Sequence, residues 1–220
     1  MSEFDRKVAI VTGASSGIGR RTAELLEERG ARVVTFARSE GTVRGDVADP
    51  EAVERLFAET ESRFGPCDIL VNAAGMIDAT PLVDMPFDVW QRTFDVNVHG
   101  IYLTCRRALP SMLERGSGAI VNVSSISGVV GPEKFPGFVA YCASKGAVIS
   151  LTEALAVEVK SRGVRVNAVS PGSVDTPMWA EVSGGAPASM TAAEVAETIL
   201  FLASERSRPM NGQNLNVYSA

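Results

Sequence analysis

Four short motifs in this sequence combine residues that bind phosphates with residues that move protons. In chain order they are the glycine-rich stretch from Thr12 to Gly19, the stretch from Asn72 to Gly75, Ser125, and Tyr141 followed four residues later by Lys145. A glycine-rich turn can hold a pyrophosphate, and a phenol beside an ammonium can act as a general acid and base. Together they indicate a nicotinamide-dependent oxidoreductase, because hydride transfer to a carbonyl needs a dinucleotide and a proton donor in one site.

The first motif has the glycine spacing of a dinucleotide-binding turn. Glycines at positions 13, 17 and 19 permit a tight turn, close approach of the backbone to a pyrophosphate and close packing of the next helix. The residues expected to bind the cofactor here are Gly13, Ser15, Ser16, Gly17, Ile18 and Gly19. The same stretch matches the Gly-x-Ser-x-Gly pattern of hydrolase nucleophiles, but it follows the first predicted strand, and a triad would need the single histidine, His99. We therefore favour the dinucleotide turn.

The residues after the second predicted strand bear on the choice between NAD and NADP. An acidic side chain here would bind the ribose 2′-hydroxyl of NAD, whereas an arginine accommodates the 2′-phosphate of NADP. The sequence has Ala37 and Arg38 at this point, with Ser39 as a second donor and Glu40 close by. Because a guanidinium can bind phosphate through two hydrogen bonds, we expect NADP(H) to be preferred, with NAD(H) as the alternative.

Tyr141 and Lys145 are the candidates for proton transfer. They are four residues apart on a predicted helix, so their side chains share one face. A nearby ammonium favours the phenolate, so we expect Lys145 to lower the pKa of Tyr141 toward the range of a general acid and base. Ser125 follows an apolar strand and can donate a hydrogen bond to a substrate oxygen, with Ser124 and Ser127 as alternatives.

Two kinds of apolar pattern alternate along the chain and predict the elements that position these residues. Short β-branched runs predict strands at Lys7 to Thr12, Arg32 to Ala37, Asp68 to Val71, Ala119 to Val123, Val164 to Val169 and Asn214 to Val217. Helical periodicity predicts helices at Gly17 to Arg29, Pro50 to Phe64, Phe87 to Val96, Gly100 to Leu113, Tyr141 to Arg162 and Thr191 to Ala203. Arg38 to Asp49 is expected to be a loop. Asn97, at the end of one predicted helix, is a catalytic candidate, and the alternatives are a helix cap or a buried amide.

This alternation predicts an α/β fold, a Rossmann-type doubly wound parallel sheet with helices on both faces. The 220 residues fit a single domain, residues 1–220, that carries both the cofactor and the substrate site. In such sheets ligands bind beyond the carboxyl ends of the strands. Gly13, Asn72, Ser125 and Pro171-Gly172 each follow a predicted strand, so we expect the motifs to converge at one edge of the sheet.

Composition argues against several other classes of function. The formal net charge is -5 and no run of Lys or Arg forms a basic stripe, so nucleic acid is not an expected partner. No apolar stretch approaches the roughly 20 residues of a membrane span, and the N-terminus lacks an apolar signal core, so we expect a cytoplasmic protein without a membrane partner. Three isolated cysteines and one histidine argue against a metal site.

With these motifs in order, the chain resembles the short-chain dehydrogenase/reductase family from Lys7 to Val217. The resemblance implies that Tyr141 exchanges the proton, and that Lys145 lowers its pKa and holds the nicotinamide ribose. It also implies that Ser125 orients the substrate oxygen and that Asn97 organises a water relay. The cofactor contacts that it implies are Asp46 and Val47 at the adenine, Asn72 at the ribose, and Ala73, Gly75, Pro171, Gly172, Val174 and Thr176 elsewhere. A homodimer or homotetramer through the helices around residues 100–113 and 141–162 is implied as well.

Three departures from the family pattern bear on the substrate and the assembly. The interval from Ser125 to Tyr141, with Gly131-Pro132 and Pro136-Gly137, is longer than the usual dozen or so residues. The stretch from Pro177 to Thr191, where the family commonly has a longer lid, is short, and Gly212 to Ala220 replaces the usual Val-Asp-Gly-Gly ending.

The first two departures include several large apolar residues, and the short lid from Met178 to Val182 has no Lys or Arg. We therefore expect a small, partly apolar ketone or secondary alcohol as the substrate. The residues expected to meet it are Val129, Val130, Phe135, Phe138, Met178 and Trp179. The alternatives are an enzyme like a 3-oxoacyl-(acyl-carrier-protein) reductase, and a catalytically idle dinucleotide-binding sensor or scaffold.

Overall fold

The computed structural model describes residues 2–131 and 134–218. Pro132, in the long interval before Tyr141, and Ser219 and Ala220, in the unusual ending, lie outside the described residues.

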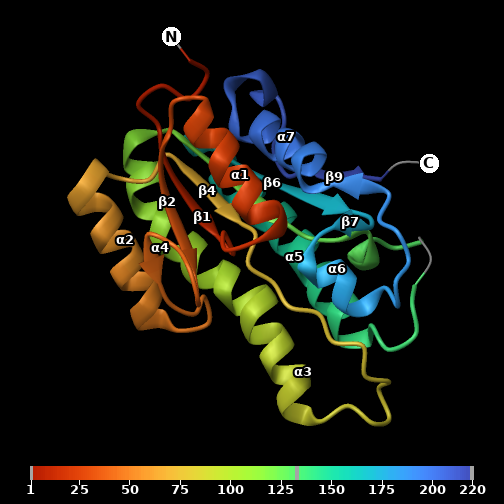
Figure 1. Cartoon of the computed structure of the whole chain (residues 1–220). Coiled ribbons are helices and arrows are strands. Elements are labelled where there is room, and N and C mark those ends of the chain that lie inside the picture. Colours follow the sequence, from red (N-terminus) through yellow and green to blue (C-terminus); the bar gives the residue numbers. More distant parts are fainter. Residues whose placement is uncertain (1, 132–133, 219–220) are drawn as a thin grey trace.

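A parallel sheet forms the centre of the fold (Figure 1). Among the described residues it contains seven strands in the order β3-β2-β1-β4-β5-β6-β9. These strands are β1 (Val8–Thr12), β2 (Arg32–Ala37), β3 (Val43–Arg44), β4 (Ile69–Asn72), β5 (Gly118–Val123), β6 (Val164–Pro171) and β9 (Asn214–Val217). Thr12, the last residue of β1, lies opposite Phe36 of β2 and Asn72 of β4. The strand order reverses between β1 and β4, so their carboxyl ends flank the crevice in which such sheets bind ligands.

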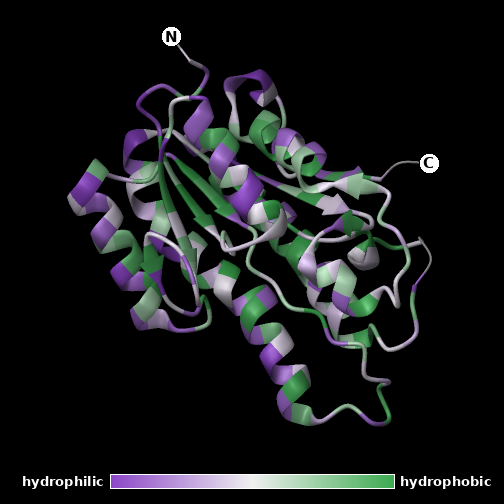
Figure 2. Cartoon of the chain, viewed as in Figure 1, coloured by the Kyte–Doolittle hydropathy of each residue, from purple (hydrophilic) through white to green (hydrophobic). Residues whose placement is uncertain are grey.

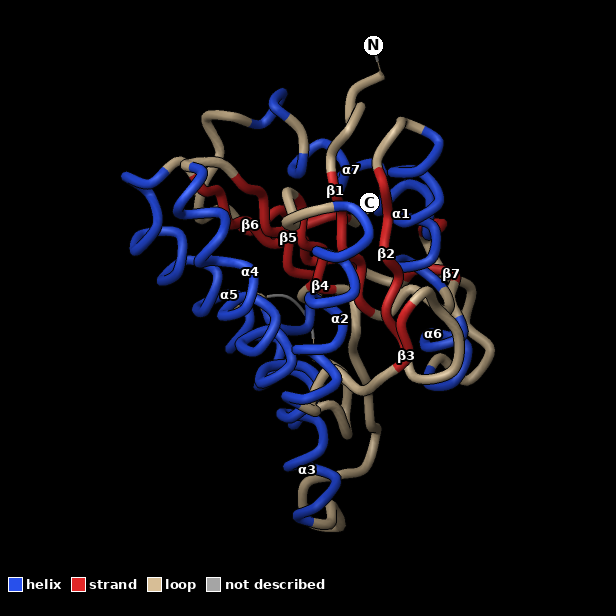
Figure 3. Tube along the Cα trace, turned by 90° about the vertical axis from the view of Figure 1, so that its left-hand side faces the viewer, coloured by secondary structure: helices blue, strands red, loops and turns tan. Residues whose placement is uncertain are grey.

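Helices cover both faces of the sheet, as the turned view in Figure 3 shows. They are α1 (Gly17–Glu28), α2 (Pro50–Phe64), α3 (Phe87–Phe94), α4 (Gly100–Arg115), α5 (Val139–Val159), α6 (Pro177–Val182) and α7 (Ala192–Ala203). Helices α2, α4 and α5 pack on one face, and α1 and α7 pack on the other. Helix α3 extends beyond the sheet in both Figure 1 and Figure 3.

The central strands are buried on both faces. Ile10 and Leu70 pack under α2, α4 and α5, whereas Val11 and Val71 pack under α1 and α7. All four side chains are fully buried, and the central strands are coloured as hydrophobic in Figure 2. A strand covered on both faces needs apolar residues at every position, which explains the unbroken apolar runs in the sequence. The predicted α/β fold is therefore confirmed.

The structure adds short elements that the sequence patterns do not predict. Strand β3 lies within the predicted loop after Arg38, and β7 (Val174–Asp175) pairs with β8 (Met190–Thr191) beside α6. Strands of two residues are too short to show a period in the sequence. The predicted gap before Gly100 is also wrong, because a π-helical turn (Asp95–His99) joins α3 to α4. Asn97 therefore lies inside a continuous helical segment and not at a helix end.

No helix among residues 2–131 and 134–218 has both the length and the hydrophobicity that a membrane span needs.

Backbone packing fixes the turn after β5 against α5. Ser125 leads into a 3-10 turn (Ile126–Gly128), and a Cβ added to Gly128 would lie 2.5 Å from the carbonyl carbon of Lys145 and 2.6 Å from the nitrogen of Gly146. These atoms belong to the helix backbone, which cannot move aside as a flexible side chain would. The position of Ser125 relative to α5 therefore depends on a glycine at position 128.

We predict that Gly128→Ala destabilises the fold by about 1–3 kcal/mol, because the added methyl group overpacks this contact. Gly146→Ala is the matched control: its nearest neighbour would be the Gly128 oxygen at 3.4 Å. Because alanine favours helix by up to about 1 kcal/mol over glycine, this variant should be as stable as the wild type or more so. Urea unfolding of the three proteins measures the difference, and equal stability of the two variants would contradict the close contact.

Candidate active site

A cavity of about 700 Å³ lies at the carboxyl ends of β1, β4, β5 and β6. Its described lining includes every predicted catalytic and cofactor-binding residue except Asn72 and Asn97. The predicted residues that line it are Gly13, Ser15, Ser16, Gly17, Ile18, Gly19, Arg38, Asp46, Val47, Ala73, Gly75, Ser125, Tyr141, Lys145, Pro171, Gly172, Val174 and Thr176. The structure thus brings the cofactor motif and the proton-transfer residues into one space.

The glycine-rich turn forms a narrow part of this cavity. Gly13 has a φ of +67°, and a Cβ there would lie 2.6 Å from the Cα of Ala74. Gly17 has a φ of +53°, and its added Cβ would lie 2.9 Å from the methyl group of Thr176, another lining residue. Ser16 is the N-cap residue of α1, and its side chain makes no hydrogen bond to the N–H groups of the first helical turn. Glycines in a turn let the backbone approach a pyrophosphate closely, and N–H groups at a helix N-terminus can donate hydrogen bonds to it. Both features fit a dinucleotide.

Tyr141 and Lys145 lie one turn apart on α5, and both are buried. The Lys145 nitrogen is 5.7 Å from the centroid of the Tyr141 ring and donates a hydrogen bond of 2.9 Å to the carbonyl of Val123. The ring of Phe138 meets the Tyr141 ring edge-on, with centroids 6.1 Å apart. The phenol ring is therefore held between an ammonium and an aromatic edge.

The hydrogen bonds of the candidate serines distinguish Ser125 from Ser124. The Ser124 hydroxyl donates to the carbonyl of Lys145 at 2.8 Å, so it ties β5 to α5. The Ser125 hydroxyl accepts the Ser127 N–H at 3.2 Å and also hydrogen-bonds to the Tyr141 phenol. The geometry therefore favours Ser125 as the hydroxyl that shares a substrate oxygen with Tyr141.

Burial governs the protonation of both proton-transfer candidates. It raises the pKa of the Tyr141 phenol, and the hydrogen bond with Ser125 lowers that pKa only in part. Burial also lowers the pKa of the Lys145 ammonium from 10.5 to about 8. The expected fall in the Tyr141 pKa is therefore wrong for the chain by itself, because desolvation of the phenol gives a net shift in the opposite direction. At neutral pH the phenol carries its proton.

Asn97 is a buried amide with its hydrogen bonds made. Its oxygen accepts the Met76 N–H at 2.8 Å, and its nitrogen donates to the Met76 carbonyl at 3.0 Å and to the Ser144 hydroxyl at 2.9 Å. These bonds join the π-helical turn to α5 and to the segment after β4. The oxygen would lie 3.4 Å from a Cβ on Gly75, as would the Lys145 nitrogen, so Asn97 sits directly behind the cavity wall. Its role in a water relay stays a prediction.

Asn72 also points away from the cavity. Its nitrogen donates to the Asn122 side chain at 2.9 Å, and its oxygen accepts the Thr104 hydroxyl at 2.8 Å. The Asn122 nitrogen in turn donates to the Thr152 hydroxyl at 2.9 Å. This buried row connects β4, β5, α4 and α5, so the Asn72 amide serves the fold. Its contact with the cofactor ribose stays a prediction.

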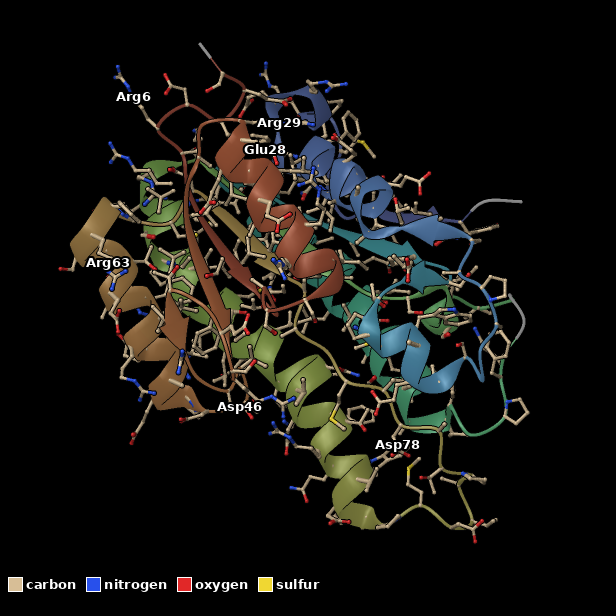
Figure 4. All side chains as sticks on the ribbon, viewed as in Figure 1. Arg6, Glu28, Arg29, Asp46, Arg63 and Asp78 are labelled. Carbon is tan, nitrogen blue, oxygen red and sulfur yellow. The ribbon has the colours of Figure 1, made fainter. Side chains whose placement is uncertain are left out.

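Charged residues gather at the far end of the cavity from Tyr141, beyond β2. Arg38, Asp46 and Arg92 all line this end, and Figure 4 shows Asp46 close to α3. Asp46 accepts hydrogen bonds from the Arg92 guanidinium and from the Ala48 N–H. Partial burial raises the pKa of Asp46, but these two bonds and the charges of Arg92 and Arg38 together hold the pKa below its usual value. Asp46 is therefore a fixed carboxylate between two arginines.

Of the six apolar residues expected to meet the substrate, four line the cavity and two do not. Phe135, Phe138, Met178 and Trp179 line the cavity. Val129 and Val130 are not among its described lining residues, and Val130 is 98% exposed, because the chain leaves the cavity there before it returns at Phe135. The sequence analysis missed Met76, Ile77, Arg92 and Tyr218, which lie outside the motifs and reach the cavity only through tertiary packing.

Comparison with known proteins agrees with this geometry. The sequence profile of the family described as short chain dehydrogenase matches residues 7–186. The 2-(R)-hydroxypropyl-CoM dehydrogenase of Xanthobacter autotrophicus is 40% identical, over 95% of this chain and 96% of its own length. The cis-4-hydroxycyclohexanecarboxylate dehydrogenase of Sinomonas cyclohexanicum is 39% identical, over 97% of this chain and 96% of its own length.

A solved structure gives the same result. A short-chain type dehydrogenase/reductase from Mycobacterium marinum superposes with a TM-score of 0.92 at 31% identity, covering 98% of this chain and 95% of that one. The profile match spans most of the chain, and the relatives align over nearly all of it. The chain therefore belongs to the short-chain dehydrogenase/reductase family, NAD(P)-dependent oxidoreductases that act on CH–OH groups.

Proposed function

We propose that the protein is an NADP(H)-preferring oxidoreductase that interconverts a small, partly apolar ketone and its secondary alcohol. One observation carries the proposal: the phenol of Tyr141, the hydroxyl of Ser125 and the ammonium of Lys145 lie in the same cavity as the glycine-rich turn. Both relatives named above are dehydrogenases whose names specify a hydroxylated compound, which supports chemistry at a CH–OH group.

The residues around the cavity suit the two ends of a dinucleotide. The glycine-rich turn and the N-terminus of α1 would hold the pyrophosphate, and Pro171, Gly172, Val174 and Thr176 would border the nicotinamide. When bound, the nicotinamide supplies or accepts the hydride.

The side chains of this chain perform the proton chemistry. In reduction Tyr141 donates its proton to the substrate oxygen, because its raised pKa keeps the phenol protonated at neutral pH. Ser125 donates a hydrogen bond to the same oxygen as negative charge develops on it. Lys145 lies against the phenol ring and stabilises the negative charge that remains on Tyr141 after transfer. In oxidation the same groups act in reverse.

The preference for NADP(H) is supported by the cavity end beyond β2. Arg38 and Ser39 both line it, whereas the carboxylate among its described lining residues, Asp46, is engaged by Arg92. An exposed guanidinium with an adjacent hydroxyl suits a 2′-phosphate. Assembly with further copies of this chain through α4 and α5 is part of the proposal, and exposed Tyr102 and Val157 on these helices support it.

Tyr141→Phe should lower kcat for ketone reduction at least about a hundredfold while NADPH still binds, because the variant keeps the ring and loses only the proton donor. Absorbance of NADPH measures turnover, and its fluorescence measures binding. Tyr102→Phe is the matched control, since it removes the same oxygen from an exposed position on α4. Turnover by Tyr141→Phe at the rate of this control would refute the role of the phenol.

Arg38→Ala should raise the KM for NADPH about tenfold to a hundredfold and leave the KM for NADH unchanged, because it removes a charge-assisted bond to the 2′-phosphate. Arg44→Ala removes an exposed arginine from the adjacent strand β3 and should change neither constant. Equal effects of Arg38→Ala on both cofactors would show that the guanidinium does not select NADP(H).

The buried ammonium of Lys145 gives a pH dependence of stability. Its pKa is about 8 in the folded chain and near 10.5 when unfolded, so between these values the unfolded chain binds more protons. The folded state therefore gains stability relative to Lys145→Met as the pH rises from 8 to 10.5, by up to about 1.4 kcal/mol per pH unit. Urea unfolding without cofactor, at several pH values, measures this difference. Parallel stability curves for the wild type and Lys145→Met would contradict a lowered pKa.

A further inference from the structure

The substrate part of the cavity has an aromatic wall with no role in the proton chemistry. Phe135 and Phe138 come from the long interval between Ser125 and Tyr141, and both line the cavity. Their ring centroids are 5.8 Å apart, and Phe138 then meets the catalytic phenol of Tyr141 edge-on at 6.1 Å. Three rings therefore form a continuous row that leads outward from the reacting atoms.

The outer ring of this row presents an apolar surface that a ligand can cover. Phe138 is buried, whereas Phe135 is 50% exposed although it lines the cavity. A half-exposed phenyl ring gains free energy when another apolar group removes its surface from water. Aromatic pairs add to this gain when their rings meet at an offset or edge-on.

The segment that carries Phe135 is anchored by its neighbours. The Lys134 ammonium donates to the carbonyl oxygen of Val129, on the turn that follows Ser125. Gly137 packs against the segment after β4, since a Cβ there would lie 2.1 Å from the carbonyl oxygen of Ala79. A wall fixed in advance binds a ligand with less loss of conformational entropy than a loop that orders on binding.

Charge is absent from this part of the described lining. The charged residues that line the cavity in the described part of the chain are Arg38, Asp46, Arg92 and Lys145. The first three lie at the cofactor end, and the Lys145 nitrogen bonds to the Val123 carbonyl. The Trp179 N–H donates to the Ala186 carbonyl at 2.9 Å, so the indole offers its apolar surface. A carboxylate here would lose water without gaining a partner, which is unfavourable.

We propose that the aromatic wall recognises an uncharged aryl or cycloalkyl ring next to the reacting carbon of the substrate. Phe135 is then the residue that determines this specificity. The inference rests on the proposed function. Phe138 contacts both Phe135 and Tyr141, so a substrate ring seated on Phe135 would extend an aromatic cluster that includes the catalytic phenol. The substrate class is then a neutral ring-bearing ketone or secondary alcohol.

The test compares kcat/KM for acetophenone and 2-butanone in the wild type and three variants. The wild type should prefer acetophenone, and Phe135→Ala should lower this preference about tenfold while 2-butanone turnover is kept. Phe135→Leu keeps apolar area without the ring and should show a smaller loss. Val130→Ala changes an exposed side chain of the same segment and should leave the preference as in the wild type. An unchanged preference in Phe135→Ala would overturn the proposal.

A charged probe tests the second half of the inference. 4-Acetylbenzoate adds a carboxylate to the same ring, and its kcat/KM should be at least about tenfold below that of acetophenone. Turnover of 4-acetylbenzoate at or above the rate of acetophenone would overturn the assignment of a neutral substrate.

Binding without turnover separates this inference from the proposed function. Calorimetry with benzamide, an unreactive ring compound, should show binding to the wild type with NADP+ present and at least about tenfold weaker binding to Phe135→Ala. Binding of benzamide by a protein that reduces no ketone would reject the proposed function and keep the ring site. Turnover of 2-butanone without benzamide binding would reject the ring site alone.

Discussion

The contact between α5 and the carboxyl end of β5 is the constraint on which the site depends. The Ser124 hydroxyl bonds to the carbonyl of Lys145, and the Lys145 ammonium bonds back to the carbonyl of Val123. Gly128 lets the turn after Ser125 touch the helix backbone at the same level. These contacts fix the Ser125 hydroxyl, which lies on a loop, relative to the Tyr141 phenol and the Lys145 ammonium, which lie on α5. This arrangement exists before a ligand binds. Such preorganisation lets polar groups stabilise developing charge without rearranging.

Burial shifts the pKa values of the phenol and the ammonium in this geometry, and it carries a cost for the fold. Tyr141 and Lys145 are both buried, and the described chain offers the ammonium a backbone carbonyl and an aromatic ring as neighbours in place of a carboxylate. Its pKa falls to about 8 for that reason, and the contribution of Lys145 to the stability of the folded state decreases as the pH falls from 10.5 to 8. The same desolvation keeps the phenol protonated. A buried charged group that costs stability is typical of sites where function and stability compete.

Features that depend on local chemistry could be predicted from the sequence. The glycine spacing defines the turn at Gly13 to Gly19, and the spacing of Tyr141 and Lys145 places them on one helix face. Unbroken apolar strands predict a sheet covered on both faces. Together these patterns account for the fold and for the convergence of most site residues at one cavity.

Features that depend on distant contacts could not be predicted. Arg92 meets Asp46 across 46 positions, and Asn97 turns inward because a π-helical turn continues α3 into α4. The predicted direction of the Tyr141 pKa shift was wrong, because the sequence shows a neighbouring charge but not the extent of burial. Val130 shows the same limit: its apolar type suggests a cavity residue, yet the path of the loop leaves it exposed.

The central claim is that Tyr141 and Ser125 jointly hold the substrate oxygen beside a dinucleotide on the glycine-rich turn. A crystal structure of the protein with NADP+ and 1-phenylethanol tests it most directly. The account predicts the alcohol oxygen within about 3 Å of both the Tyr141 and the Ser125 hydroxyls. A complex with the dinucleotide on Gly13 to Gly19 and the alcohol oxygen in contact with neither hydroxyl would contradict it.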